Sequence, residues 1–177
     1  MKTLYFVSLV ALAGLVGCAE IATLHCGNVN EYAFGERAGQ AGRSKAALQS
    51  EIATCAATEH PLDERRVMAG YEAGRLAYCS PEGAFRTGQA GLSIRPVCTA
   101  GERAGMGRAH RLGQQDRELQ VRVRSLTGER RELREARAAL GPDDDAEARR
   151  LGDEISRLTR RIERLEDRRL LLSLFDG

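Results

Sequence analysis

Apolar side chains are spaced along the chain in different ways, and each spacing predicts a different kind of segment. Near the start, residues 4–16 form a run in which Ser8 is the only strongly polar side chain. Near the end, apolar residues recur at alternating intervals of four and three, the spacing of a coiled-coil seam. No stretch alternates apolar and polar positions for long enough to predict a strand. The pattern therefore predicts an all-α fold.

The first apolar run is typical of a secretory signal. It follows a single positive charge at Lys2, and it is shorter than the roughly 20 residues that a membrane span requires. It ends in Leu15-Val16-Gly17-Cys18, which resembles the lipobox of bacterial lipoproteins. This resemblance implies cleavage before Cys18 and attachment of lipid to its sulfur and its new amino group, since several acyl chains anchor far more firmly than one. The alternative is an ordinary signal peptide with a cysteine near its cleavage site.

The expected lipid also predicts a location. Residues 1–17 would be the signal peptide, and residues 18–25 a lipidated tether. The residue after Cys18 is Ala19 rather than Asp, which in enteric-type bacteria favours sorting to the outer membrane. We therefore expect a protein of the cell envelope, anchored by lipid to the outer membrane and facing the periplasm.

Composition adds two constraints. The chain of 177 residues has a formal net charge of +2, which argues against a strongly basic nucleic-acid binder. It has five cysteines, an odd number that fits a secreted protein only if one is used elsewhere. With Cys18 lipidated, four remain for two disulfides in an oxidising compartment, and three connectivities are open. We favour Cys79–Cys98 with Cys26–Cys55, because Cys79 and Cys98 flank one short segment.

The cysteines define a glycine-rich domain over residues 26–110. Gly35-Glu36-Arg37-Ala38-Gly39 recurs letter for letter at 101–105, residues 70–74 have the same glycine spacing, and residues 38–42 are echoed at 87–91. Glycine in a helix costs about 1 kcal/mol relative to alanine, so its repetition indicates close packing of backbones. The interpretation favoured here is tight crossing of short helices; the alternative is a ligand or partner cleft lined by bare backbone.

Capping residues predict where the helices of this domain begin. Asn28 or Asn30 suits a first helix reaching about Gly42, and a second is expected over 44–57. Asp63 suits the start of a helix to about Tyr78, and Ser80-Pro81 the start of another. A small disulfide-stapled bundle of short helices is therefore expected.

A string of spaced tyrosines, glycines and cysteines runs through this domain. It resembles a family of bacterial lipoproteins of unknown function that have a lipobox, a Gly/Tyr/Cys-rich helical domain and often a coiled-coil tail. The resemblance covers about residues 26–110 and implies no reaction and no catalytic residues. It is carried by Cys55, His60-Pro61, Gly70-Tyr71, Gly74, Tyr78-Cys79, Pro81, Gly83, Phe85, Gly88, Gly91 and Val97-Cys98.

Residues 111–175 predict a long antiparallel helical hairpin, a coiled coil. Two helices, about 111–140 and 146–173, are separated by Gly141-Pro142 and three aspartates, which end one helix and start the next. Polar residues interrupt the apolar seam at Asp116, Arg130 and Arg137 in the first helix and at Arg169 in the second. Since such a seam is incomplete, the hairpin is expected to dimerise or to bind a partner helix. The partner-binding candidates are Leu151, Ile155, Leu158, Ile162 and Leu165.

Charges dominate the hairpin surface. Residues 111–173 hold sixteen arginines against fourteen acidic residues. Pairs at Glu118/Arg122 and Asp153/Arg157 are expected to add a few tenths of a kcal/mol each. The arginines could form a basic patch for phosphates or lipid headgroups, but the interleaved acids favour a solvated coiled-coil surface.

Residues that carry chemistry are few. No nucleophile elbow, metalloprotease motif or C-x-x-C is present, so we expect no catalytic residue, no metal and no cofactor besides lipid on Cys18. His25-Cys26 with Cys55 and His60 could form a zinc site, but the cysteines are expected to be oxidised. The sequence favours a non-enzymatic envelope module that presents the hairpin to a periplasmic or envelope protein or to a second copy of itself, and not to nucleic acid. The alternatives are an accessory regulator of an envelope-sensing or transport system, and a metal-binding or enzymatic envelope protein.

Overall fold

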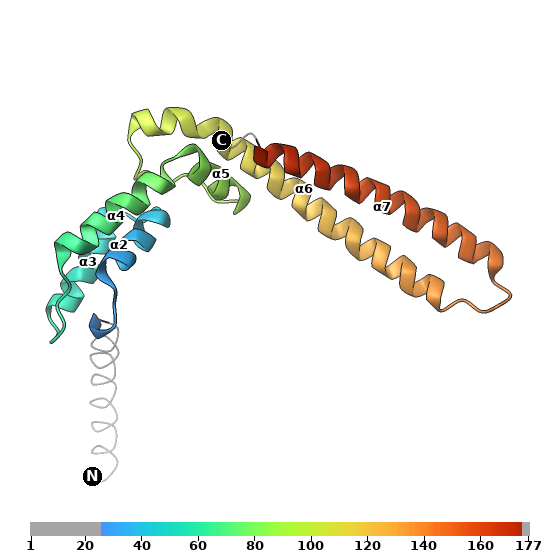
Figure 1. Cartoon of the computed structure of the whole chain (residues 1–177), viewed down its shortest axis with the longest axis horizontal. Helices are drawn as coiled ribbons and strands as arrows, with labels where there is room; N and C mark the ends of the chain where they lie inside the picture. The colour runs from blue at the N-terminus through green and yellow to red at the C-terminus, as the bar shows by residue number, and fades with distance from the viewer. Residues whose placement is uncertain (1–25, 175–177) are drawn as a thin grey trace, which may run out of the picture. The chain divides into compact units, whose positions relative to one another are not determined.

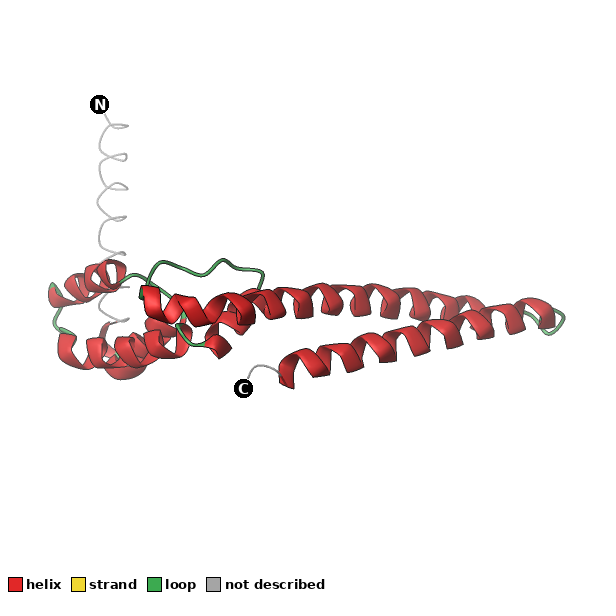
Figure 2. Cartoon of the chain, turned by 90° about the horizontal axis from the view of Figure 1, so that it is seen from above, coloured by secondary structure: helices red, strands yellow, loops and turns green. Residues whose placement is uncertain are grey.

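The computed structural model describes residues 26–174, and every regular element in that range is a helix. Figure 1 shows these helices, and Figure 2 shows that loops and turns join them. The described residues form two compact units: unit 1 comprises 26–79 and 95–99, and unit 2 comprises 80–94 and 100–174. The expected all-α class is confirmed. The helices are α2 (Glu31–Gln40), α3 (Lys45–Ala56), α4 (Glu64–Tyr78), α5 (Pro81–Gln89), α6 (Ala100–Ala138) and α7 (Asp145–Leu174).

The starts of the four short helices are fixed by the capping residues that the sequence indicated. The side chain of Asn30 accepts from the Ala33 amide at 3.0 Å, so Asn30 rather than Asn28 caps α2. Ser44, Asp63 and Ser80 cap α3, α4 and α5 in the same way. Each such cap stabilises its helix by about 1 kcal/mol. Local sequence therefore sets the helix boundaries in this part of the chain.

Glycines bring α2 and α4 into backbone contact in unit 1. A Cβ atom built on Gly35 would lie 1.8 Å from the Val67 carbonyl oxygen. On the facing helix, a Cβ on Gly74 would lie 2.0 Å from the Glu36 carbonyl oxygen. Gly39 and Gly70 are confined in the same manner, so each helix offers two glycines to the other. The repeated glycines thus serve the tight crossing that the sequence favoured, and α2 and α4 leave no cleft between them for a ligand.

A small apolar core surrounds this crossing. Leu48 and Ile52 of α3 cluster with Val67 and Tyr71 of α4 and with Ala38 of α2. Leu48 and Val67 are fully buried. The Tyr71 hydroxyl lies at the edge of the core and donates to the Arg43 carbonyl oxygen at 2.9 Å. This bond ties α4 to the loop that follows α2.

Two disulfides hold unit 1 together. Cys26 bonds to Cys55 and Cys79 bonds to Cys98, with Cα–Cα distances of 5.7 and 5.5 Å. The favoured connectivity is therefore confirmed. The second disulfide joins segment 95–99 to the end of α4, and the Arg95 amide adds a 2.9 Å hydrogen bond to the Tyr78 hydroxyl.

In unit 2, α5 and α6 repeat the crossing of α2 and α4. A Cβ on Gly88 would lie 2.2 Å from the His110 carbonyl oxygen, and one on Gly113 would lie 2.1 Å from that of Phe85. The corresponding distances in unit 1 are nearly the same: a Cβ on Gly39 would lie 2.2 Å from the Tyr71 carbonyl oxygen, and one on Gly74 would lie 2.0 Å from that of Glu36. The echo of residues 38–42 at 87–91 therefore marks structurally equivalent positions at the ends of α2 and α5.

The equivalence extends to the turns after α2 and α5. Gly42 and Gly91 both have positive φ, 62° and 71°, which favours glycine. The Tyr71 hydroxyl bonds the carbonyl after Gly42, and His110 Nε2 lies 2.7 Å from Leu92 O, the carbonyl after Gly91. A carbonyl oxygen only accepts, so Nε2 carries the hydrogen of that bond. The chain thus contains two copies of one helix-pair module, with Tyr71 in the first replaced by His110 in the second.

The module copies differ at one end of the crossing. Where α2 and α4 have Gly35 and Gly70, α5 and α6 have Ala84 and Ala109 at the equivalent places, and both alanines are buried. The first copy therefore brings two backbones together at both ends of the crossing, and the second does so at one end.

The second half of α6 and the whole of α7 form the expected antiparallel hairpin, seen side by side in Figures 1 and 2. Val123 and Leu126 of α6 cluster with Ile162 and Leu158 of α7. The connection is closed by a 2.9 Å hydrogen bond from the Gly141 amide to the Asp144 carboxylate. Its helices were expected at 111–140 and 146–173; α7 matches closely, but α6 begins at Ala100.

The earlier start of α6 has a physical reason. Residues 100–110 were expected in the glycine-rich domain, but Gly101, Gly105 and Gly107 stand among residues with good helix propensity. The expected boundary between 110 and 111 therefore falls inside one continuous helix, which packs first against α5 and then against α7.

Candidate functional sites

The expected signal peptide (1–17) and the whole of the expected tether (18–25), including the proposed lipid-attachment residue Cys18, lie outside the described residues. The four described cysteines are Cys26, Cys55, Cys79 and Cys98, and they pair with one another. Cys18 is the one other cysteine of the sequence, so no further cysteine of this chain remains to bond with it.

The zinc site that the sequence left open does not fit the arrangement of its residues. Cys26 and Cys55 are joined to each other, and a disulfide sulfur lacks the thiolate charge that binds zinc. The ring of His60 lies against Gly27, where a Cβ would come within 2.9 Å of Cδ2. His25 lies outside the described residues. The ring of the exposed His60 thus lies next to the residue that follows Cys26.

Three of the five apolar residues of α7 that were partner-binding candidates, Leu158, Ile162 and Leu165, pack in the hairpin's own core. Leu151, Leu158 and Ile162 are buried, and Ile155 and Leu165 are half-buried. Leu158 and Ile162 contact the apolar side chains of α6. A partner that left the hairpin closed would have to contact other side chains of α7.

A buried ion pair crosses the hairpin near its base. Asp116 on α6 is 4% exposed and accepts from Arg169 on α7, with Nε–Oδ1 at 2.9 Å and Nη2–Oδ2 at 3.3 Å. Gln89, at the end of α5, donates to the same carboxylate at 2.9 Å. One carboxylate thus joins three helices of unit 2. In the sequence, Asp116 and Arg169 appear only as separate interruptions of two apolar seams. The available signal was that both lie at seam positions at similar distances from the Gly141 turn.

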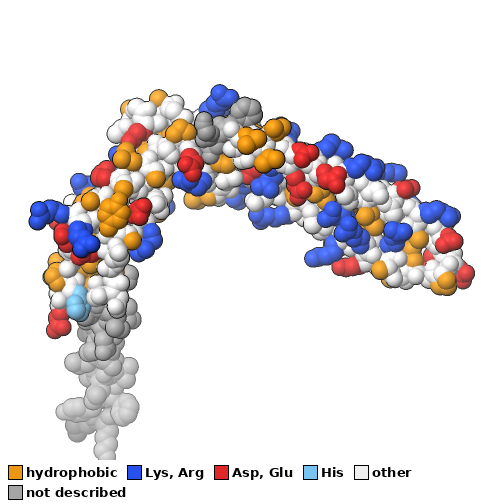
Figure 3. Space-filling model, in the orientation of Figure 1, with side chains coloured by type: hydrophobic (Ala, Val, Ile, Leu, Met, Phe, Trp, Pro, Cys, Tyr) orange, Lys and Arg blue, Asp and Glu red, His pale blue; other side chains and the backbone are white. Residues whose placement is uncertain are grey.

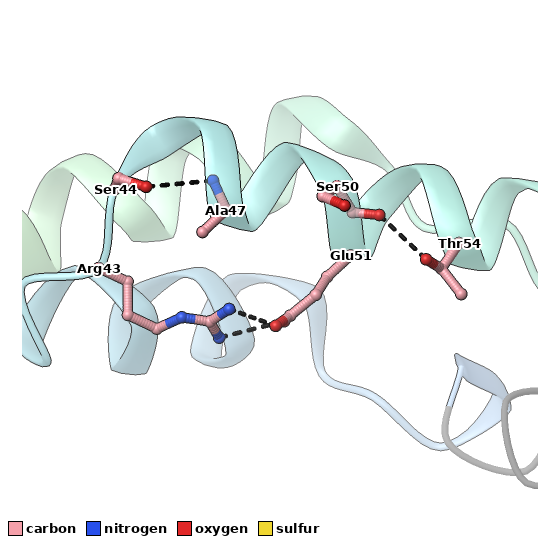
Figure 4. A network of polar contacts seen from close by, with 6 residues as sticks. All are labelled: Arg43, Ser44, Ala47, Ser50, Glu51 and Thr54. Atoms are coloured by element: carbon pink, nitrogen blue, oxygen red, sulfur yellow. Dashed lines mark hydrogen bonds and ion pairs between the residues drawn. The ribbon is translucent and has the colours of Figure 1, made fainter.

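A second ion pair lies in unit 1. Figure 4 shows Arg43, in the loop after α2, facing Glu51 of α3, with Nη1–Oε2 at 3.1 Å and a second contact through Nη2. Hydrogen bonding to Glu51 raises the pKa of the Arg43 guanidinium further above its ordinary value. Beside the pair lies a pocket of about 270 Å³, lined in part by Arg43, Ser44 and Arg95. Two arginines line this pocket. Arg43 is already paired with Glu51, so an anion in the pocket would interact with Arg95.

The expected surface pairs of the hairpin form in other places. Neither Glu118/Arg122 nor Asp153/Arg157 is an ion pair in the described structure. Instead Arg150 pairs with Glu147 and Glu154, which lie one turn away on either side. The hydrogen bond from Arg150 lowers the pKa of Glu147. Spacing alone allowed both sets of pairs, and side-chain rotamers decide between them.

Comparisons with known proteins are consistent with the resemblance stated above. Within residues 26–174, no helix is both long and apolar enough to cross a membrane. No curated protein and no solved structure matches the chain. Residues 30–115 match a family model described as a protein of unknown function (DUF2799). That range begins at the cap of α2 and ends just before Asp116, so it spans both helix-pair modules and stops short of the hairpin seam. The chain thus carries a domain of an uncharacterised family, followed by a hairpin outside the matched region.

Proposed function

We propose that this protein is a lipid-anchored component of the bacterial cell envelope that acts as a non-enzymatic interaction module. Its signal and lipobox residues support cleavage before Cys18 and lipid attachment there, and Ala19 supports sorting to the outer membrane. The mature chain would then face the periplasm.

The observation that carries this proposal is the pairing of all four other cysteines. Disulfides form and persist in oxidising compartments such as the periplasm and are rare in the cytosol. The two bonds account for Cys26, Cys55, Cys79 and Cys98, which leaves Cys18 for a separate use. The odd number of cysteines fits a lipidated protein better than a plain secreted one.

The proposed interaction role is supported by the partners of the polar side chains in the described residues, which are other groups of the same fold. Tyr71 and His110 form hydrogen bonds to the turns after α2 and α5. Glu51 and Asp116 form ion pairs with Arg43 and Arg169. These contacts stabilise a scaffold rather than surround a substrate. The scaffold presents a hairpin whose seam is closed and whose outer faces are free to contact another molecule, which supports an interaction role.

Metabolic labelling tests the anchor. Radiolabelled palmitate is expected in the wild-type protein and in a Cys26→Ser variant, which lacks the next cysteine along the chain. The Cys18→Ser variant is expected to carry no label. Equal labelling of the Cys18→Ser and wild-type proteins would refute lipid attachment at this residue.

Photo-crosslinking in intact envelopes tests the interaction role. A crosslinking amino acid at Val121, which is 57% exposed on α6, should capture an envelope component. The same group at the buried Leu158 should react within the hairpin instead. If the outer positions of α6 and α7 capture nothing while the protein is present at normal levels, the hairpin is not a binding element.

A further inference from the structure

Arginines gather on one face of α7. Their spacing of three or four residues places them along one side of the helix over its C-terminal two-thirds. All are exposed, and none makes an ion pair within residues 26–174. We refer to them as the arginine face, which consists of Arg157, Arg160, Arg161, Arg164 and Arg168.

Acidic side chains of the same stretch lie mostly on other sides of the helix. With 3.6 residues per turn, Glu163 and Glu166 fall on the neighbouring flank, and Asp167 alone lies within the arginine face. The face therefore carries five positive charges and one negative charge. The near balance of arginines and acids over the whole hairpin conceals this local excess.

Three exposed leucines lie beyond Arg168 at the end of the helix. Leu171 falls on the arginine face, and Leu174 and Leu170 fall on the flank beside it that also carries Glu163. They are 56%, 69% and 61% exposed, so the hairpin core does not use them. Figure 3 shows hydrophobic side chains gathered at this end of α7, next to Arg side chains of the hairpin. An apolar group of side chains thus adjoins the basic face at the C-terminal end of α7.

A pocket in the hairpin surface adjoins the arginine face. It has a volume of about 310 Å³ and is lined by Gln115, Glu118, Leu119 and Arg122 of α6 and by Arg168 of α7. Its two guanidinium groups outnumber its one carboxylate, and Leu119 supplies an apolar wall. A phosphate group could receive hydrogen bonds from both arginines, since the guanidinium fork matches phosphate oxygens.

We propose that the arginine face, the pocket beside it and the leucine end of α7 form a docking surface for an anionic lipid surface. The arginines contact headgroup phosphates, Arg122 and Arg168 share one phosphate, and Leu170, Leu171 and Leu174 enter the boundary of the acyl region. Amphipathic helices bind membranes in this way, by apolar burial together with attraction of basic residues to anionic lipid.

The leucines favour lipid over other anionic partners. Nucleic acid and acidic peptides would also be attracted by the arginine face, but neither needs three exposed leucines at its end. Exposed leucines next to water are unfavourable unless something covers them, and an acyl boundary covers them without a shaped partner. The inference goes beyond the proposed anchor, because the folded hairpin makes this contact whether or not Cys18 carries lipid.

Vesicle binding tests the proposal with the chain from Ala19 onward, which keeps every described residue and lacks Cys18. Vesicles of phosphatidylcholine mixed with phosphatidylglycerol are compared with vesicles of phosphatidylcholine alone. We expect binding to the anionic vesicles only, and weaker binding at higher salt. Replacing Arg161, Arg164 and Arg168 by Gln is expected to weaken binding on the order of 100-fold, since each basic residue near such a surface contributes about a factor of 5 to 10.

A matched control distinguishes the position of the arginines from the overall loss of positive charge. Arg124→Gln, Arg131→Gln and Arg134→Gln remove the same charge from α6 on the opposite flank of the hairpin and are expected to retain most of the binding. Leu171→Gln with Leu174→Gln should weaken binding without changing the charge. Circular dichroism verifies that each variant stays helical, and Gln is chosen because its helix propensity is close to that of Arg and Leu.

Several results would overturn the proposal. These are equal binding to neutral and anionic vesicles, equal loss in the two arginine triples, and no effect of the leucine variants. Competition distinguishes the other sources of negative charge: release from vesicles by inorganic phosphate at low concentration would indicate a free-phosphate site, and tighter binding to polyglutamate than to vesicles would indicate an acidic protein partner. Loss of palmitate labelling at Cys18 would refute the anchor and leave these outcomes unchanged.

Discussion

Arg169 on α7 and Asp116 on α6 form a bidentate ion pair, with Nε–Oδ1 at 2.9 Å and Nη2–Oδ2 at 3.3 Å. Each residue interrupts the apolar seam of its own helix, and each interruption is compensated by the other. Asp116 and Arg169 face each other in only one antiparallel register. Their ion pair therefore also fixes how the two helices align.

Breaking this pair on one side should destabilise unit 2. Asp116→Ala leaves the Arg169 guanidinium, whose side chain is 27% exposed, without its carboxylate. We expect a loss of about 2–3 kcal/mol in the free energy of unfolding, somewhat below the cost for a fully buried pair. Replacing both residues by Leu should recover most of that loss, because a continuous apolar seam removes both charges. Chemical denaturation measures this, and a double variant no more stable than Asp116→Ala would contradict it.

Two glycines in identical pentapeptides should respond in opposite ways to substitution. In residues 35–39, a Cβ on Gly39 would lie 2.2 Å from the Tyr71 carbonyl oxygen, so Gly39→Ala must separate α2 from α4. In residues 101–105, a Cβ on Gly105 meets nothing within 4 Å. Gly105→Ala should therefore stabilise by up to about 1 kcal/mol, and Gly39→Ala should lower the melting temperature markedly. Thermal unfolding of both variants decides the matter, and equal effects would show that the two segments pack alike.

These glycines also show where sequence reasoning reached its limit. Residues 101–105 repeat 35–39 letter for letter, yet the less exact echo of 38–42 at 87–91 occupies the structurally equivalent positions. Identity in five letters does not specify what lies opposite a helix face, and only the partner carbonyl makes a glycine necessary. By contrast, capping at Asn30, Ser44, Asp63 and Ser80 depends on neighbours three residues away at most, and those helix starts could be predicted.

The candidate sites also divide into features set by nearby residues, which could be predicted, and features set by distant contacts, which could not. The disulfide pairing followed from short loops, and the hairpin from its apolar period and its Gly141-Pro142 break. The Asp116–Arg169 pair depends on two residues more than fifty positions apart, and the arginine face emerges only when charges are sorted by helix side. The placement of α7's apolar residues against α6 also required the folded hairpin.

Tyr71 should make stability depend on alkaline pH. Burial, and secondarily the charge of Glu72, raise the pKa of its phenol above the ordinary value of 10.0. The folded state therefore holds this proton more tightly than the unfolded chain does, so the contribution is complete below about pH 10 and is lost as pH rises through the folded-state pKa. Tyr71→Phe should remove this alkaline loss, at a cost of about 1 kcal/mol at neutral pH for the hydrogen bond to Arg43. Unfolding curves across alkaline pH would disprove the assignment if wild type and variant lose stability in parallel.

The two disulfides should be separable by their effects. Cys79 and Cys98 are 19 residues apart, and Cys26 and Cys55 are 29 apart, so each bond should contribute about 3–4 kcal/mol by restricting the unfolded chain. Paired Cys→Ser variants should each lose about that much. Peptide mapping without reduction should join Cys26 to Cys55 and find no free thiol among the four. Recovery of a Cys26–Cys79 or Cys26–Cys98 peptide from native protein would exclude this arrangement.

Because α6 is one continuous helix, a force on the hairpin is transmitted along it to the crossing with α5. The helix crosses α5 at Gly113 and continues about 37 Å from there to Ala138, compared with about 20 Å in the other direction to Ala100. A sideways load at the hairpin tip would therefore be magnified at the crossing, where the backbones touch and no side chain cushions them. The ion pair of Asp116 and Arg169 lies just beside that fulcrum, where it ties α7 to the same point. Within unit 2, force applied to the hairpin would therefore act on the α5–α6 crossing.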